Sequence, residues 1–546
     1  MIGISHIHPL RKIKSRIVDI AEGLGMTLPE MRCFLVDWQE FICLIEKNVF
    51  PSSPTNIWEG KEVVNKRLRV ERGVEPGIIY EVVQPGDPSY VYLNETNSDC
   101  INASVMAHVC GHCEFAKIGA KASCEVDRTE RVLYLTRLVN AAKDRMGERD
   151  YIRYWNAAES LIPFVRPDSQ YSLENSLERD TAISEQVLNT EESGSSGSRY
   201  YSSSLARLLE FGEAADKRRM QKAVDHKRQQ NEIDRKGYRL RAPCEDIMGF
   251  IMQNTQASDY ERSILHYLYE VNRQYRRFMH TQIMDEGWCM YWEKKIMMDM
   301  LKERHVTGAI EYLKTFAHVC YPRPFFMRNP YHLGYSLWCE IEDLHSKGKL
   351  TVDYVEEKDR DTKENWDRKP KEDTIEYMRN LVRTITDHEF LRRFLTLDLI
   401  EKFCLNRIPI NMAKIMGIPP NDVYREDKLF IWIHPLIVRE SMLRSFLHFG
   451  RPRVYIIDDD FKSEGGLLLY HRNDKLGTLR ENWIPGTLAS VSKLWKRPVH
   501  LITYDDDETG QLISFTGGSM QDSVDIQYPD FDEVRANMLS GKKGYE

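Results

Sequence analysis

The chain has 546 residues, with 76 lysines and arginines against 83 aspartates and glutamates, and a formal net charge of −7. This length leaves room for roughly three or four domains with large buried cores. The hydrophobic share of 42% excludes a wholly disordered chain, and the acidic balance argues against general nucleic-acid binding.

No apolar run approaches the length of about 18 residues that a spanning helix needs, so we expect no membrane span. The first residues lack the basic and apolar regions of a secretory leader, which predicts a cytoplasmic protein. The eleven cysteines are then expected to be mostly reduced thiols.

The N-terminal part predicts both helices and short strands. Apolar spacing and turn residues predict helices over 10–25, 60–72, 104–118, 123–145 and 148–163, and strands over 77–83 and 90–93. Asn102 and Ser104 are the candidate caps of the third of these helices.

Residues 189–204 contain seven serines and two glycines but no aliphatic side chain, which is typical of a flexible linker. The following stretch, 214–240, is dense in charge and locally basic. A solvated helix or tail is the favoured interpretation there, with nucleic-acid contact as the alternative.

The second half is helical and then changes character. Helices are predicted through 244–315 and over 330–346, 372–386 and 388–405. After Pro419 and Pro420, strands are predicted over 429–433, 453–457, 466–470 and 500–504, with a helix over 486–496. The fold class is therefore α+β, with predominantly helical N-terminal and central regions and a smaller α+β C-terminal domain.

These changes divide the chain into five predicted segments. They are an N-terminal region over 1–184, a flexible charged linker over 185–240, a central helical region over 241–425, an α+β domain over 426–520 and a polar tail over 521–546.

The densest chemical segment runs from Ala107 to Phe115 and contains His108 and His112. Four residues apart on a helix, the two imidazoles share one face and can bind one cation. Two helical histidines at this spacing are, by themselves, more often not a metal site.

A second segment strengthens the metal interpretation. Glu286 and Glu293 are seven residues apart, on one face of a predicted helix, and Glu286 is surrounded in sequence by Met and aromatic residues. A carboxylate among apolar side chains destabilises the fold unless it is paired with a positive group or binds a metal. The alternative is that Glu286 lies on the solvent-exposed face of an amphipathic helix.

Two histidines on one helix and a glutamate on another resemble the ligand set of gluzincin zinc peptidases. Those enzymes use His-Glu-x-x-His, in which the Glu is the general base. Val109 occupies that place here and cannot accept a proton, so the standard mechanism is not available. Glu114, one turn further on, is the candidate substitute.

Several motifs, in one order along nearly the whole chain, resemble the stage V sporulation protein R (SpoVR) family. They are Ile79-Tyr-Glu-Val, Asp87-Pro-Ser-Tyr, Ala107-His-x-x-x-His-x-x-Phe115-x-Lys117, Met284-Asp-Glu-Gly-Trp, Tyr291-Trp292, Asn329-Pro-Tyr-x-Leu-Gly334, Asp387-x-x-Phe-Leu-Arg and Leu494-Trp-x-Arg-Pro-Val-His500. The resemblance implies a link to spore cortex formation in some bacteria, although the family also occurs in bacteria that form no spores.

The chain departs from the family pattern at the second segment. Asp285 replaces an Asn, Cys289 an Ala, and Glu293 a His, while His332 stands where Tyr or Ala is expected. An oxygen donor in place of a nitrogen donor would favour Fe or Mn, and His332 is a candidate compensating ligand.

Two other segments contain residues that could form a site. Cys110-Gly-His-Cys113 matches a dithiol redox motif, but it falls inside a predicted helix without the usual preceding Trp, so core thiols are favoured. The acidic runs 458–460 and 505–508 lack the ligand spacing of a calcium loop, and solvated turns are favoured.

The sequence therefore predicts a metal site of His108, His112, Glu286 and Glu293 that binds Zn, Fe or Mn. The leading hypothesis is a metal-dependent, hydrolase-like protein of cell-envelope, sporulation or stress physiology. The alternative is a non-catalytic regulatory or scaffold protein with a structural or vestigial site. A protein partner and the substrate are left open.

Overall fold

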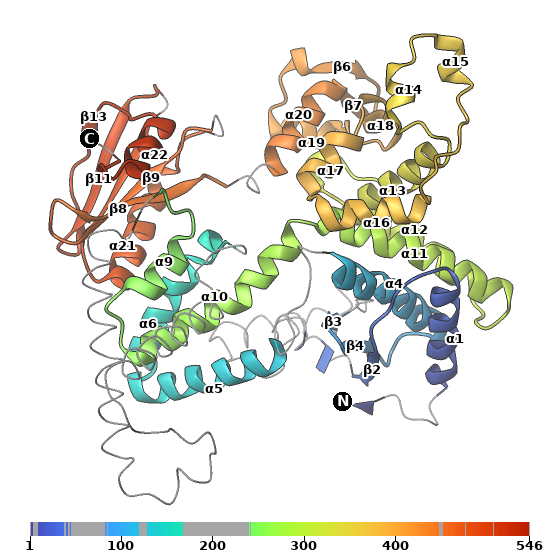
Figure 1. Ribbon diagram of the computed structural model, residues 1–546, viewed down its shortest axis with the longest axis horizontal. Helices are drawn as coiled ribbons and strands as arrows, with labels where there is room; N and C mark the ends of the chain where they lie inside the picture. Colours follow the sequence, from blue (N-terminus) through green and yellow to red (C-terminus); the bar gives the residue numbers. More distant parts are fainter. Residues whose placement is uncertain are drawn as a thin grey trace, which may run out of the picture. The chain divides into compact units, whose positions relative to one another are not determined.

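A computed structural model describes most of the chain (Figure 1). The described residues are 2–3, 9–37, 40–41, 44, 82–84, 86–119, 128–166, 240, 242–446, 451–474, 477–505 and 507–544. The chain divides into two compact units, the first formed by Met1–Thr136 and Gln274–Arg451 and the second by Arg137–Arg273 and Pro452–Glu546.

The first unit begins with a small mixed sheet. Its strands are β1 (Ile2–Gly3), β2 (Met31–Val36), β3 (Val82–Gln84) and β4 (Ser89–Asn94), in the order β1-β2-β4-β3 with β2 and β4 parallel. Helix α1 (Leu10–Gly23) ends as predicted, and Gly25 follows with a φ of 87°, which glycine adopts without strain.

Helix α4 (Asp99–Ile118) carries both histidines and packs against α1 and β4. It begins five residues earlier than predicted, because Ser98 is the N-cap and its side chain accepts the backbone N–H of Ile101. The predicted caps Asn102 and Ser104 are therefore inside the helix, where both are buried.

Helix α11 (Gln282–Lys302) lies between α4 and α13 (Pro330–Ser346) and packs against both. Glycine allows these contacts to be close. A Cβ added to Gly111 would lie 2.5 Å from the Cα of Cys289, and one added to Gly287 would lie 2.2 Å from the carbonyl carbon of Gly334. Both distances are too short for a side chain, so the helix backbones touch at these crossings.

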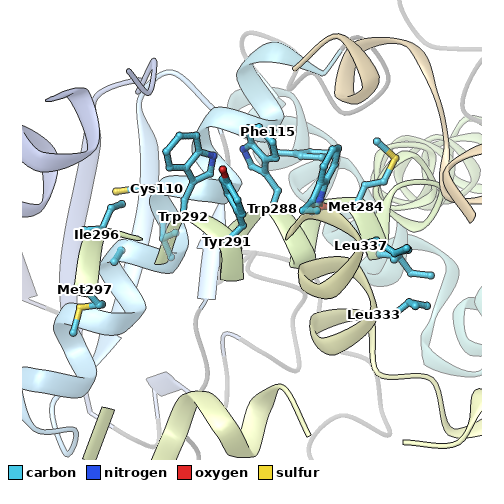
Figure 2. Close-up of a cluster of buried hydrophobic side chains, with 14 of the residues drawn as sticks. Cys110, Phe115, Met284, Trp288, Tyr291, Trp292, Ile296, Met297, Leu333 and Leu337 are labelled. Atoms are coloured by element: carbon cyan, nitrogen blue, oxygen red, sulfur yellow. The ribbon is translucent and has the colours of Figure 1, made fainter. Parts of the chain in front are cut away.

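Large aromatic side chains fill the core around α11 (Figure 2). Trp288 packs edge-on against Trp292 and Trp338, with ring centroids 5.7 and 5.1 Å away, and stacks on Tyr291 at 6.0 Å. The indole N–H of Trp338 donates to the carbonyl of Met284 at 2.9 Å. The helix that carries Glu286 is thus held by buried aromatic contacts.

The rest of the first unit is helical, with a three-stranded antiparallel sheet in the order β5-β7-β6 among the described residues. Its elements are α12 (Ala309–Val319), α14 (Val352–Glu356), α15 (Arg360–Glu364), α16 (Thr374–Thr384), α17 (Asp387–Phe394), α18 (Leu397–Lys402), β5 (Arg407–Pro409), α19 (Ile410–Met416), β6 (Val423–Glu426), β7 (Phe430–Ile433) and α20 (Pro435–Phe446). The single helix predicted over 388–405 is two, α17 and α18.

The second unit combines helices with a mixed sheet. The helices include α6 (Glu148–Glu159), α9 (Ile247–Asn254) and α21 (Ile484–Trp495), while α5 (Arg128–Met146) and α10 (Asp259–Met279) each contain a unit boundary. The sheet has the order β12-β11-β10-β9-β8, with β13 paired to β11; its strands are β8 (Val454–Phe461), β9 (Gly466–His471), β10 (Val499–Tyr504), β11 (Gly510–Thr516), β12 (Ser519–Met520) and β13 (Val524–Ile526). Strands β9 and β10 are parallel.

The predicted polar tail contains structure. Helix α22 (Phe531–Leu539) begins at Asp530, whose side chain accepts the backbone N–H groups of Asp532 and Glu533. Val534 and Met538 are buried in a core cluster of the second unit. At nine residues, this helix is shorter than the window of about 11–18 residues over which helical periodicity is reliable.

The α+β class is confirmed, with helices dominating the N-terminal and central parts. All but the last residue of the expected linker over 185–240 and of the basic stretch over 214–240, and the whole predicted helix over 60–72, lie outside the described residues. The five-segment division stays a prediction. Among the described residues, none of the helices is both long enough and apolar enough to cross a bilayer.

Candidate metal centre

The two histidines of α4 point at the same neighbour. His108 and His112 are one turn apart, and their ring centroids are 5.1 Å apart. The His108 side chain is 3% exposed and that of His112 11%. The four-residue spacing therefore places both imidazoles on one face of the helix, as predicted, and that face is largely buried.

Glu286 of α11 meets both imidazoles. Its Oε2 lies 3.6 Å from Nε2 of His108 and 3.6 Å from Nε2 of His112. Donor atoms about 2.1 Å from one tetrahedral metal ion lie about 3.4 Å from each other. Glu286 Oε2 thus lies from each of the two Nε2 atoms at nearly the spacing of two ligands that share one ion.

The same carboxylate oxygen has no hydrogen-bond donor among the described residues, although it is buried. A buried carboxylate oxygen is costly when nothing compensates its charge. A cation between Glu286 and the two imidazoles would supply that compensation.

Each imidazole ring also contacts a carboxylate of its own, on the side of the ring opposite to Glu286. Nδ1 of His108 lies 2.9 Å from Oε2 of Glu293, and Nδ1 of His112 lies 2.9 Å from Oδ1 of Asp285. An ionised carboxylate can only accept, so each Nδ1 donates its proton and leaves the Nε2 lone pair toward Glu286. Histidine ligands of metals are commonly oriented in this way.

Ser104 extends this arrangement by one more bond. Its hydroxyl donates to Oε1 of Glu293 at 2.7 Å, so both oxygens of Glu293 are engaged. The structure therefore brings all four predicted residues together, but it places Glu293 on the far side of the His108 ring from Glu286.

The local charge is negative before any ion binds. Burial by itself lowers the pKa of His112, but the charge of Asp285, its hydrogen bond and the charge of Glu286 raise the pKa above its ordinary value. Asp285 and Glu286 are only 13% and 17% exposed. Positive charge is thus favoured between these residues, either as a proton on a histidine or as a metal ion.

Cys289 lies beside the same histidines. Its Sγ and one ring nitrogen each of His108 and His112 all lie within 4.8 Å of one another, a group that could hold a metal ion. In the sequence, Cys289 differs from the Ala of the family pattern, and nothing local marks it as a metal ligand.

Other residues considered from the sequence have different roles. Glu114 is fully buried and accepts hydrogen bonds from Trp288 Nε1 at 3.2 Å and Arg379 Nη2 at 2.9 Å, so it is an ion-paired core residue rather than a base for the site. Val109 is fully buried. His332 lines a cavity of about 50 Å³ together with Phe325 and Phe446, and it is not a member of the donor group of His108, His112 and Cys289.

The Cys110–Cys113 pair does not form a dithiol site of the redox type. Both residues are inside α4 and buried, and neither is part of a disulfide. Burial, followed by the nearby Cys113, raises the pKa of Cys110 well above its ordinary value. A thiol with a raised pKa is a poor nucleophile.

One positioning residue was not recognised from the sequence as part of the site. Asp387 is buried, and its carboxylate accepts the backbone N–H groups of Ile283 at 2.8 Å and Met284 at 3.0 Å, at the first turn of α11. Burial raises the pKa of Asp387 to about 8 despite these bonds, which by themselves lower it. A cap supplied by a residue 104 positions away has no local sequence pattern.

The fold and these contacts define a class of protein. It is an α+β protein in which two helices bring a pair of carboxylate-held histidines and a third carboxylate into one largely buried cluster.

The family follows from comparison. The family model described as SpoVR like protein matches residues 5–424, so the chain belongs to the SpoVR family. It is also 23% identical over 474 residues to the Uncharacterized protein YcgB of Escherichia coli (strain K12), covering 83% of this chain and 84% of that protein. No solved structure matches the chain.

Proposed function

We propose that this protein binds one divalent metal ion through Nε2 of His108, Nε2 of His112 and Oε2 of Glu286. The observation that supports this most is the 3.6 Å separation of the glutamate oxygen from both imidazole nitrogens. Asp285 and Glu293 orient the two rings from behind, each at 2.9 Å.

The two engaged oxygens of Glu293 favour an orienting role for this residue over direct ligation. Two nitrogens and one oxygen suit Zn, Fe or Mn.

We further propose that the site is hydrolase-like. Three protein ligands leave a fourth position open for water or a substrate oxygen, as in catalytic rather than structural zinc sites. A bound divalent ion supplies Lewis acidity, which polarises a carbonyl or phosphoryl oxygen and lowers the pKa of water. The partial exposure of Glu286 is compatible with access from outside. The sporulation or cell-envelope setting is part of this proposal and rests on the family.

The second candidate function is a regulatory or scaffold protein with a structural ion. Val109 favours it, because a fully buried valine stands where zinc peptidases have their general base. Neither Glu114 nor Glu293 is available as a replacement, since both carboxylates are engaged by other side chains.

Metal analysis tests the shared ligand set. We expect purified wild-type protein to hold about one divalent ion per chain by elemental analysis and the His108→Ala variant to hold much less, because loss of one of three ligands weakens binding strongly. The matched control is His305→Ala, which removes an exposed histidine just beyond α11. Equal metal content in the wild type and His108→Ala would refute the site.

Water access separates the two candidate functions. With Mn²⁺ as the bound ion, an open position exchanges water and enhances the relaxation of bulk water protons, whereas a closed structural site does not. We expect enhancement in the wild type that is lost in His108→Ala. Bound Mn²⁺ without enhancement would favour the structural alternative.

A further inference from the structure

Cys289 lies on the same side of α11 as Asp285, one helical turn further on. The thiol is buried, and its Sγ lies 3.7 Å from Oδ1 of Asp285, the carboxylate that also holds His112. With one nitrogen from each of His108 and His112, it completes a group of donors within 4.8 Å of one another. Cys289 is thus one member of a cluster rather than an isolated thiol.

Gly111 makes this position accessible to the thiol. A Cβ at residue 111 would lie 2.9 Å from Sγ of Cys289, and residue 111 is between the two histidines on α4. Only a residue without a side chain lets the sulfur approach that stretch of the helix. The close helix crossing therefore brings a soft donor to the histidine pair.

The cluster then contains two kinds of donor around the same imidazoles. Glu286 offers a hard oxygen, 3.6 Å from each Nε2, and Cys289 offers a soft sulfur. Sulfur and nitrogen on one tetrahedral zinc ion lie about 3.6 Å apart. The Sγ of Cys289 and one ring nitrogen of each histidine lie no more than 4.8 Å from one another, so the sulfur and each nitrogen need to approach by about 1.2 Å at most.

We propose that Cys289 is the soft ligand of this centre and that it binds thiophilic ions such as Zn²⁺, Co²⁺ and Cd²⁺ together with His108 and His112, in place of Glu286. Hard ions such as Mn²⁺ use the nitrogen and oxygen donors alone, so the thiol sets which metal the site prefers. On ligation the S–H bond breaks, a sulfur–metal bond forms, and the proton is released. This inference rests on the proposed metal function.

The test uses Co²⁺ alone, added to metal-free full-length protein under reducing, oxygen-free conditions. A cysteine ligand produces a sulfur-to-cobalt charge-transfer band in the near ultraviolet, whereas histidine and carboxylate ligands produce only the weaker visible bands. We expect the charge-transfer band in the wild type and in Cys113→Ala, the matched control, which removes a buried thiol of α4 outside the group. We expect its loss in Cys289→Ala, with the visible bands retained.

Metal preference provides a second measurement. Loss of a soft ligand lowers the affinity for Cd²⁺ and Zn²⁺ but not for Mn²⁺, so we expect Cys289→Ala to reduce the ratio of Cd²⁺ to Mn²⁺ affinity by about tenfold or more. An unchanged ratio would contradict the proposal. The ¹¹³Cd resonance of the wild-type protein needs no variant and reports directly whether sulfur is bound, so a misfolded variant does not prevent a decision.

The outcomes separate this inference from the function on which it rests. Visible cobalt bands without a charge-transfer band, together with a ¹¹³Cd shift typical of nitrogen and oxygen ligands, would overturn the role of Cys289 and leave the site of His108, His112 and Glu286 intact. Failure of the wild type to bind Co²⁺ at all would overturn both.

Discussion

At the scale of single residues, the centre is organised by pairs of polar contacts. Each histidine makes one 2.9 Å contact to a carboxylate through Nδ1 and presents Nε2 to Glu286. The two orienting residues differ in exposure, since the Glu293 side chain is 6% exposed and that of Asp285 13%. His108 is thus held in the more enclosed half of the site.

Buried histidines elsewhere predict how stability depends on pH. His471 of β9 is buried in the second unit, donates or accepts a 3.0 Å hydrogen bond with Thr503 and stacks on Tyr504. Burial lowers the pKa of His471 to about 4. The unfolded chain, with an ordinary pKa of about 6.5, takes up a proton between these values that the folded chain does not.

Folding stability therefore falls as the pH drops from about 6.5 toward 4. Between pH 7 and pH 5 we expect the free energy of unfolding of the wild type to lose about 2 kcal/mol through this residue. The His471→Gln variant should lose less over the same interval, as measured by urea unfolding at both values. His434→Gln, at an exposed position, is the control and should follow the wild type. Parallel losses in all three proteins would refute this role for His471.

At the scale of elements, the contact between α4 and α11 decides the geometry of the centre. The two helices touch at Gly111 and Cys289, and α11 is closed on its other side by Gly287 against Gly334. Asp387 holds the first turn of α11 through two backbone hydrogen bonds. The helix that carries three of the carboxylates is therefore fixed at its start and on two sides.

A methyl group at residue 111 is expected to force the two helices apart. The nearest atoms to the new Cβ are backbone and side-chain atoms of Cys289, at 2.5 to 3.0 Å, and backbone cannot move aside cheaply. We expect Gly111→Ala to cost about 1–3 kcal/mol in the free energy of unfolding, the usual range for overpacking, and to weaken metal binding.

Thermal unfolding and metal titration would measure these effects. The matched control is Gly23→Ala at the end of α1, where an added Cβ meets nothing within 4 Å and the protein should be unchanged or slightly more stable. If Gly111→Ala behaved like Gly23→Ala in both measurements, the close crossing would not govern the centre.

At the scale of the whole molecule, each compact unit is assembled from separate stretches of chain. The first joins Met1–Thr136 with Gln274–Arg451, and all the proposed ligands belong to it. The second joins Arg137–Arg273 with Pro452–Glu546 and contains the sheet of β8 to β13. A ligand stabilises only the structure that binds it.

Metal binding should therefore protect one unit selectively. At a metal concentration about 100 times the Kd, the stabilisation of the bound structure is about 2.7 kcal/mol. We expect amide hydrogen exchange to slow in α4 and α11 on addition of Zn²⁺, with little change in β8 to β11. The His108→Ala variant should show no such response. Equal protection of both units, or protection that persists in His108→Ala, would contradict the assignment of the ion to this centre.

Many helices and strands were predictable because the spacing of their apolar residues is visible within a short stretch of sequence. The helix over 330–346 and the strand over 466–470 match α13 and β9 within one residue at each end. Short elements inside polar stretches, and elements whose caps lie outside the apolar pattern, were harder to predict. Ser98 starts α4 earlier than expected, and α22 lies in a stretch whose composition is polar.

The sequence by itself determined that His108 and His112 share one face of a helix, because a four-residue spacing leaves no other arrangement on an α-helix. It also determined that Glu286 and Glu293 lie on a common side of α11. These are properties of one helix at a time, and they follow from 3.6 residues per turn.

Only the tertiary structure decided how the helices meet. The residues that hold the histidines are 173 and 185 positions away from them, and no local pattern encodes such a distance. The crossing at Gly111 brings α11 close enough for Glu286 to face both Nε2 atoms, for Asp285 and Glu293 to take the two Nδ1 atoms, and for Cys289 to approach. Packing of the two helices therefore separates the four predicted residues into the proposed ligands and the residue that orients one of them.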